Sequence, residues 1–339
     1  MNSHIIPLAL VISVTLATHS VAAHAQRPGR NTASSDARAA ITVDGIRRTY
    51  VLRSPRVAQQ GAQQGAQQGA QQGAQQGAQQ GALRPVVVVL HGGGGNALIS
   101  EQMSGFTALV EREGILVVYP EGTGRNPTRL LTWNAGHCCG RAMEREVDDV
   151  KFINAVIDTL IARHAADPAR IYVTGMSNGG MMSHRLGIAL APRIAAIAPV
   201  AGTLFGDEPR PSRPVPAVMF NGMQDASVPF AGGPPGGRAR RAWDGTPAQS
   251  AAEQGRFWAR ANECDATPVI ETRGTVVHTR YRCPVGREVE LYAITDGGHS
   301  WPGGKAGTRR GDRPPTSLNA TDVMWTFFKA HALTANARN

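Results

Sequence analysis

The stretch IYVTGMSNGGMM, residues 171–182, decides the fold expected for this chain. A β-branched and aromatic run ends at Gly175, a lone Ser177 follows, and an apolar segment of helical character comes next. Glycine two residues before and two residues after the serine indicates a tight strand-to-helix turn, because side chains at both positions would clash. Such a turn strains the serine backbone and sets its hydroxyl at a helix N-terminus, where free N–H groups can receive negative charge.

The expected strand directly before Ser177 and the helix directly after it favour a nucleophilic serine over a chance glycine turn. Strands and helices are also expected to alternate along the rest of the chain. The alternation predicts an α/β fold with a mostly parallel central sheet and helices on both faces. An antiparallel hairpin turns at Asp44-Gly45, and a buried strand runs from near Pro85 into a glycine loop. The expected helices cover 100–112, 147–164, 178–190, 248–262 and 316–331, and the further strands cover 114–120, 170–175, 194–202, 215–222, 275–283 and 287–295. Thr316 or Ser317 is expected to cap the last helix.

The N-terminal residues have the composition of an export signal. Residues 5–16 are almost wholly apolar, and Ala23-His24-Ala25 precedes a suitable cleavage point, so we expect a signal peptide over 1–25 and a flexible segment over 26–40. The apolar run is too short to span a bilayer, as is every later one. We therefore expect a secreted protein, extracellular or periplasmic, with one catalytic domain over 41–335.

A low-complexity block interrupts this domain. Residues 58–81 repeat Ala-Gln-Gln-Gly six times. The block has no apolar face at helix or strand period, so we expect a disordered insertion in the connection between two strands.

The net charge of +10 comes mainly from scattered arginines. Because no aromatic residues are interleaved with them, we expect a solvated basic surface and no nucleic-acid partner. A monomer is expected.

A serine nucleophile needs a base and an orienting acid. His299 lies in the glycine-rich loop TDGGHSWPGG just after an expected strand, where α/β enzymes present their working groups. Asp225 follows another strand and fits the acid. Asp207 is its competitor from the preceding loop, and Asp296 is too close to His299 in sequence to brace it easily.

The glycine loop LHGGGGN is a candidate oxyanion site. Backbone N–H groups of Gly93 and Gly94 could approach a developing alkoxide, with the N–H of Asn178 as a further donor. A phosphate-binding loop is the alternative, but no Lys and Ser/Thr follow at the required spacing. We expect neither a metal nor another cofactor.

The four cysteines are Cys138, Cys139, Cys264 and Cys283, and an exported chain permits disulfides. Cys264 and Cys283 each lie beside an expected strand and are natural partners. A bond between the adjacent Cys138 and Cys139 would be strained. Two free thiols or a partly oxidised pair are therefore alternatives for these two residues.

Five motifs in order, LHGGGGN, WNAGHCCG, VDDVKF, GMSNGG and GGHSWPGG, resemble the secreted esterases grouped with poly(3-hydroxybutyrate) depolymerases and feruloyl or acetylxylan esterases. The resemblance covers roughly residues 41–331. It implies an α/β-hydrolase fold, a triad of Ser177, Asp225 and His299, and a Cys264–Cys283 disulfide. Asn221 departs from the pattern, because relatives often have histidine there, and the repeat is foreign to it.

The resemblance further implies hydrolysis of carboxylic esters through an acyl-enzyme. The substrate could be a polyhydroxyalkanoate-type polyester or oligomer, or a feruloyl or acetyl ester. Trp133 and Trp301 are candidates for the acyl pocket, with core packing as the alternative for each. Asp148 and Asp149 are expected to cap a helix or to brace the WNAG loop. A non-catalytic surface-binding protein and a serine peptidase on the same fold are the rival functions.

Overall fold

The structure is a computed structural model that describes residue 1 and residues 38–56, 82–237, 239–307 and 311–334. The expected signal peptide at 1–25, most of the segment at 26–40 and the repeat at 58–81 lie outside the described residues.

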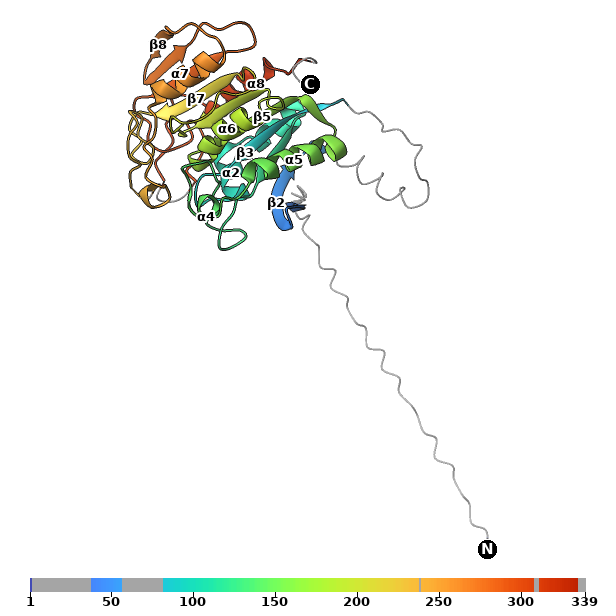
Figure 1. Cartoon of the computed structure of the whole chain (residues 1–339). Coiled ribbons are helices and arrows are strands. Elements are labelled where there is room, and N and C mark those ends of the chain that lie inside the picture. Colours follow the sequence, from blue (N-terminus) through green and yellow to red (C-terminus); the bar gives the residue numbers. More distant parts are fainter. Residues whose placement is uncertain (2–37, 57–81, 238, 308–310, 335–339) are drawn as a thin grey trace. The chain divides into compact units, whose positions relative to one another are not determined.

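One ten-stranded sheet forms the centre of the domain, in the order β1-β2-β4-β3-β5-β6-β7-β10-β9-β8 (Figure 1). The inner strands from β4 to β10 are paired in parallel, whereas β1, β2, β9 and β8 extend both edges with antiparallel pairs. This confirms the expected mostly parallel sheet. The strands are β1 Arg38–Val43, β2 Ile46–Arg53, β3 Arg84–Leu90, β4 Leu116–Pro120, β5 Ala166–Met176, β6 Ala196–Val200, β7 Ala217–Gly222, β8 Val269–Arg273, β9 Val276–Arg280 and β10 Val289–Ile294.

Helices cover both faces of the sheet, as expected. Alternate strand residues point to opposite sides, so Val86 and Val88 pack in a core with α5, α6 and α7, whereas Val87 and Val89 pack in a second core with α2, α3 and α8. The helices are α2 Ala97–Ser104, α3 Thr107–Glu113, α4 Gly140–Glu144, α5 Asp149–His164, α6 Asn178–Ala189, α7 Ala251–Ala261 and α8 Ala320–Lys329, with a 3₁₀ turn at Ala239–Arg241. None of the helices in the described ranges has the length and apolar character that crossing a membrane requires.

Two local expectations were wrong, and one strand was not foreseen. The single helix expected over 100–112 is split into α2 and α3, because Gly105 adopts a left-handed φ of 71° and ends α2. The cap of α8 is Asn319, whose side chain accepts from the N–H of Asp322, rather than Thr316 or Ser317. The edge strand β8 was missed, since its short, charged sequence carries little periodicity.

Two disulfides are present. Cys264, just after α7, is bonded to Cys283, just after β9, which is the expected pairing. Cys138 and Cys139, whose state the sequence left open, are bonded to each other.

The turn between β5 and α6 is as tight as its glycines indicate. Ser177 has φ 57° and ψ −122°, a strained conformation for a residue with a side chain. A Cβ on Gly175 would lie 2.6 Å from the carbonyl oxygen of Gly179, and a Cβ on Gly179 would lie 2.5 Å from that of Leu90. Both glycines are therefore required by backbone-to-backbone contact.

Replacing Gly179 with alanine should lower the free energy of unfolding by about 1–3 kcal/mol, because the new methyl group would overlap the Leu90 carbonyl. The better helix propensity of alanine would raise the free energy of unfolding by up to ~1 kcal/mol. A net decrease can therefore be attributed to the clash. Urea denaturation measures the effect. Gly307→Ala is the matched control, because its Cβ would meet only side-chain atoms, at 3.4 and 3.5 Å. An unchanged midpoint for Gly179→Ala would mean that the turn has spare room.

Candidate active site

The candidate base and acid are in direct contact. Asp225 follows β7 and His299 follows β10, and these strands are parallel neighbours whose carboxyl ends share one edge of the sheet. The Nδ1 atom of His299 lies 2.7 Å from Oδ2 of Asp225. The other carboxylate oxygen of Asp225 accepts from the N–H groups of Ser227 and Val228, each at 2.8 Å. This network assigns the proton to Nδ1 and leaves Nε2 of His299 as the acceptor.

The candidate nucleophile lies at the same edge of the sheet. Ser177 follows β5, which is joined through β6 to β7 by parallel pairing. It is half-buried between two buried neighbours, and its side chain does not cap α6. Within the described residues its hydroxyl makes no hydrogen bond to the ring of His299. Catalytic hydrogen bonds are often long in the absence of substrate and tighten in the complex.

Two of the three backbone N–H groups expected in the oxyanion site donate to no described residue. The N–H of Asn178 begins α6, and neither it nor the N–H of Gly93 donates to any described residue. The N–H of Gly94 donates instead to the carbonyl of Leu131 at 2.8 Å, so the expectation for Gly94 is corrected. Ideal Cβ positions at Gly92 and Gly93 fall 3.6 Å from the Cβ atoms of Ser177 and Asn178 respectively, which shows that the glycine loop lies against the serine turn.

The side chain of Asn178 fastens the serine turn to the WNAG loop. Its Oδ1 accepts from the N–H of Trp133 at 2.7 Å, and its Nδ2 donates to the Trp133 carbonyl at 3.0 Å. The Trp133 indole donates in turn to the carbonyl of His91 at 2.9 Å. One amide therefore holds two loops of the site in register.

The two tryptophans are buried. Trp133 has an exposed fraction of 0% and lies against the rings of His91 and Phe152. Trp301 is also 0% exposed and donates to the hydroxyl of Thr321 at 3.0 Å. Full burial favours core packing over contact with substrate for both side chains.

His91 is a buried support of the glycine loop. Its Nδ1 donates to the carbonyl of Gly92 at 2.8 Å, and its Nε2 accepts from the N–H of Gly122 at 3.0 Å. Because one ring nitrogen donates and the other accepts, the two contacts together require the neutral ring. Burial lowers the pKa of His91 to about 4, so the ring stays neutral near pH 7.

The two aspartates before α5 have structural contacts. Asp148 caps α5 by accepting from the N–H of Lys151 at 2.9 Å. Asp149 is buried, pairs with Arg48 at 2.7 Å and accepts from the N–H of Asn134 at 2.8 Å. The expected roles in capping and in bracing the WNAG loop are confirmed.

Asp207, the competing acid, contacts a different histidine. Its carboxylate lies 2.9 Å from Nε2 of His137, while Asp244 lies 2.7 Å from Nδ1 of the same ring. A neutral imidazole has only one N–H, so both contacts are satisfied only when His137 is protonated. The hydrogen bond to Asp207 raises the pKa of His137, burial opposes this, and the hydrogen bond to Asp244 adds to the rise. Sequence reasoning missed this cluster, which links three loops.

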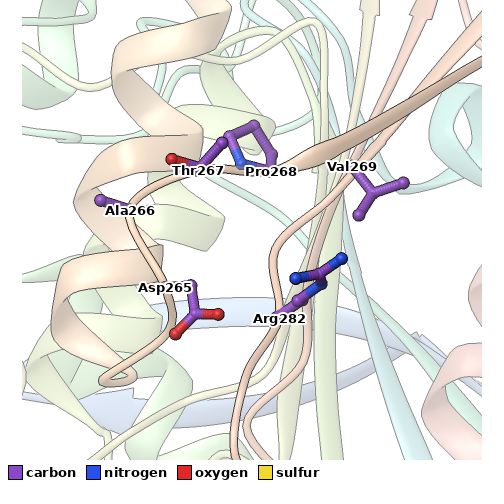
Figure 2. A pocket seen from close by; sticks show the side chains of 6 residues that line it. All are labelled: Asp265, Ala266, Thr267, Pro268, Val269 and Arg282. Atoms are coloured by element: carbon purple, nitrogen blue, oxygen red, sulfur yellow. The ribbon is translucent and has the colours of Figure 1, made fainter.

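A hollow of about 380 Å³ is lined by residues next to Cys264 and Cys283 in the sequence (Figure 2). The side chains of Asp265 and Arg282 face it from opposite sides. None of the candidate catalytic residues lines it. The described residues contain no group of three or more His, Cys, Asp or Glu side chains arranged to hold a metal.

Comparisons with known proteins point to one group. The family described as "Esterase PHB depolymerase" matches residues 74–233. Feruloyl esterase B of Piromyces equi is 32% identical over 66% of this chain, which spans 41% of that protein. Putative esterase NocK of Nocardia uniformis subsp. tsuyamanensis is 32% identical, with 70% of each chain covered. Poly(3-hydroxyalkanoate) depolymerase C of Paucimonas lemoignei is 33% identical over 35% of this chain and 28% of its own.

Among solved structures, acetyl xylan esterase from Aspergillus awamori has a TM-score of 0.51 at 15% identity, covering 83% of this chain and 94% of its own. At this identity the likeness concerns the fold, and it agrees with an α/β-hydrolase arrangement.

The stabilising contribution of His137 should be largest in acidic solution. Its pKa in the folded protein lies above the ordinary value of 6.5, so its stabilisation is complete below that pH and is lost as the pH rises through the folded-state pKa. Denaturation of the wild type and His137→Gln between roughly pH 5 and 9 should give a stability difference that shrinks with pH. Asp207→Asn, which removes one of the two carboxylates, should flatten this trend. A difference that grows with pH would contradict the bridged imidazolium.

Proposed function

The chain belongs to the esterase PHB depolymerase family, and from this premise we propose that it is a secreted serine esterase that hydrolyses carboxylic esters through an acyl-enzyme. The observation that carries the proposal is the hydrogen bond between Asp225 and His299 at the sheet edge where the strained Ser177 turn also lies.

In the proposed reaction, Nε2 of His299 takes the proton of Ser177 as the hydroxyl oxygen attacks the ester carbonyl. Asp225 holds the Nδ1 proton and offsets the positive charge that develops on the ring. The imidazolium then gives its proton to the leaving alcohol. Water attacks the acyl-enzyme with His299 again as base, which releases the carboxylic acid and restores the serine.

The free N–H groups of Gly93 and Asn178 are the proposed oxyanion donors. By analogy with other acyl-transfer enzymes, each would stabilise the transition state by about 2.7–4 kcal/mol. Both groups belong to rigid surroundings, because Gly94 is bonded to Leu131 and the Asn178 side chain is bonded to Trp133. A preorganised donor pair of this kind needs no rearrangement as charge develops.

The substrate is proposed by class. The relatives are named for feruloyl esters, acetylxylan and poly(3-hydroxyalkanoate), so the candidates are feruloyl or acetyl esters and polyhydroxyalkanoate-type polyester or its oligomers. Chromogenic esters of different acyl length, methyl ferulate, acetylated xylan and polyhydroxybutyrate particles, compared by kcat/KM or by acid released, would separate these classes. Hydrolysis of none of them would favour the non-catalytic alternative, and cleavage of peptides alone would favour the peptidase.

Ser177→Ala should lower kcat on a chromogenic ester by at least about a thousandfold, because the nucleophile is lost while the fold remains. His299→Ala should give a similar loss, and the double variant should be no worse than either single one. Ser183→Ala is a matched control on the same helix, since among the described residues its hydroxyl bonds only to the Gly179 carbonyl. A phenylmethylsulfonyl probe should label Ser177 in the wild type. Retention of near wild-type turnover by Ser177→Ala would refute the assignment.

The acid can be tested by comparing two aspartates. Asp225→Asn should reduce kcat by about 10⁴-fold if it acts as the orienting acid of a triad. Asp207→Asn should change kcat only a few-fold, since Asp207 contacts His137 instead of His299. A larger loss for Asp207→Asn at a pH where both variants are folded would reverse the assignment.

A further inference from the structure

A second carboxylate holds the candidate base. Oδ2 of Asp312 accepts the backbone N–H of His299 at 2.6 Å, from a segment thirteen residues further along the chain. A Cβ added to Gly298 would lie 2.3 Å from the same oxygen, so the carboxylate lies directly against the peptide that joins Gly298 to His299.

The chain that follows Asp312 is anchored to the loop after His299. The N–H of Gly303 donates to the carbonyl of Pro315 at 2.8 Å, and the N–H of Ala320 at the start of α8 donates to the carbonyl of Pro302 at 3.0 Å. These bonds fix both the loop after His299 and the chain leading into α8. Asp312 is solvent-exposed at a defined place beside the base.

The peptide groups next to His299 have hydrogen-bond partners of their own. The N–H of Gly297 donates to the carbonyl of Ile294 at 3.1 Å, and the carbonyl of Gly298 accepts from the N–H of Ser300 at 3.0 Å. The N–H of His299 itself is held by Asp312. Asp225 fixes only the far end of the residue, at Nδ1 of the ring. With the backbone N–H free, the ring could tilt about its bond to Asp225 and carry Nε2 away from Ser177.

We propose that Asp312 is a positioning residue for ester hydrolysis, whose carboxylate fixes the backbone of His299 so that Nε2 faces Ser177. The inference rests on the proposed function. In this proposal the carboxylate of Asp312 acts as a hydrogen-bond acceptor for the N–H of His299. An amide side chain of the same shape should therefore take its place. The negative charge strengthens this bond, but an uncharged amide oxygen at the same place can also accept the N–H.

Asp312→Ala should lower kcat by at least about tenfold with KM changed less than about twofold, because a small misplacement of a catalytic group lowers the rate and not the binding of substrate. Asp312→Asn keeps an acceptor oxygen and should restore most of the activity. Asp296→Ala is the matched control: it removes an exposed carboxylate from the same loop, and Asp296 makes no hydrogen bond to the described residues.

Each result has a defined meaning. Wild-type kcat for a folded Asp312→Ala would overturn the proposal, and so would an equal loss in Asp312→Asn, which would make the charge the active feature. A second measurement is the low-field proton NMR signal of the bond between His299 and Asp225. It should persist in Asp312→Asn and broaden or vanish in Asp312→Ala.

The NMR signal also distinguishes a failure of the proposed esterase function from a failure of the positioning role of Asp312. If the wild type hydrolyses no ester, the proposed function fails, yet the signal still reports whether Asp312 orders the ring. If Asp312→Ala does not fold, Asp312→Ser, whose shorter side chain should not reach the N–H, takes its place. An unchanged signal in the folded variant would refute the positioning role.

Discussion

Contact between bare backbones at the β5–α6 turn is the constraint on which the rest of the site depends. Gly175 and Gly179 approach within a distance that leaves no room for a Cβ, and Gly179 also lies against the carbonyl of Leu90 at the end of β3. Gly180 and Gly202 make a similar contact where α6 passes the end of β6. Packing this close lets a helix begin directly over the sheet edge, and the strain is concentrated on Ser177.

Hydrogen bonds connect the loops of the site to this turn. The amide of Asn178 binds both backbone groups of Trp133, and the Trp133 indole and the His91 ring then fix the glycine loop. Among the described residues, the N–H groups of Gly93 and Asn178 donate to no acceptor, although the chain on either side of them is held by these contacts. Donors in such rigid surroundings can be directed at one developing charge without rearrangement.

The sequence predicted the parallel sheet, the serine turn and the approach of Asp225 to His299, because these follow from periodicity, from glycine sterics and from the rule that parallel strands end at one edge. It did not predict the features that depend on distant contacts. Gly94, an expected oxyanion donor, donates its N–H to Leu131 instead, and the contact of Asp207, the competing acid, with His137 was not foreseen. Asp312 lies in a polar, irregular segment with no local pattern, so only the folded chain reveals its contact with His299.

The Cys264–Cys283 bond has a further consequence at the outer edge of the sheet. The residues that it encloses include both β8 and β9, so the terminal hairpin belongs to a covalently closed ring. An edge strand with unpaired backbone groups invites exchange with another molecule. A closed ring cannot open into a long arm, because its two ends stay together even if β8 detaches. The same bond that joins α7 to the strands therefore also protects the molecule against strand swapping in an oxidising environment.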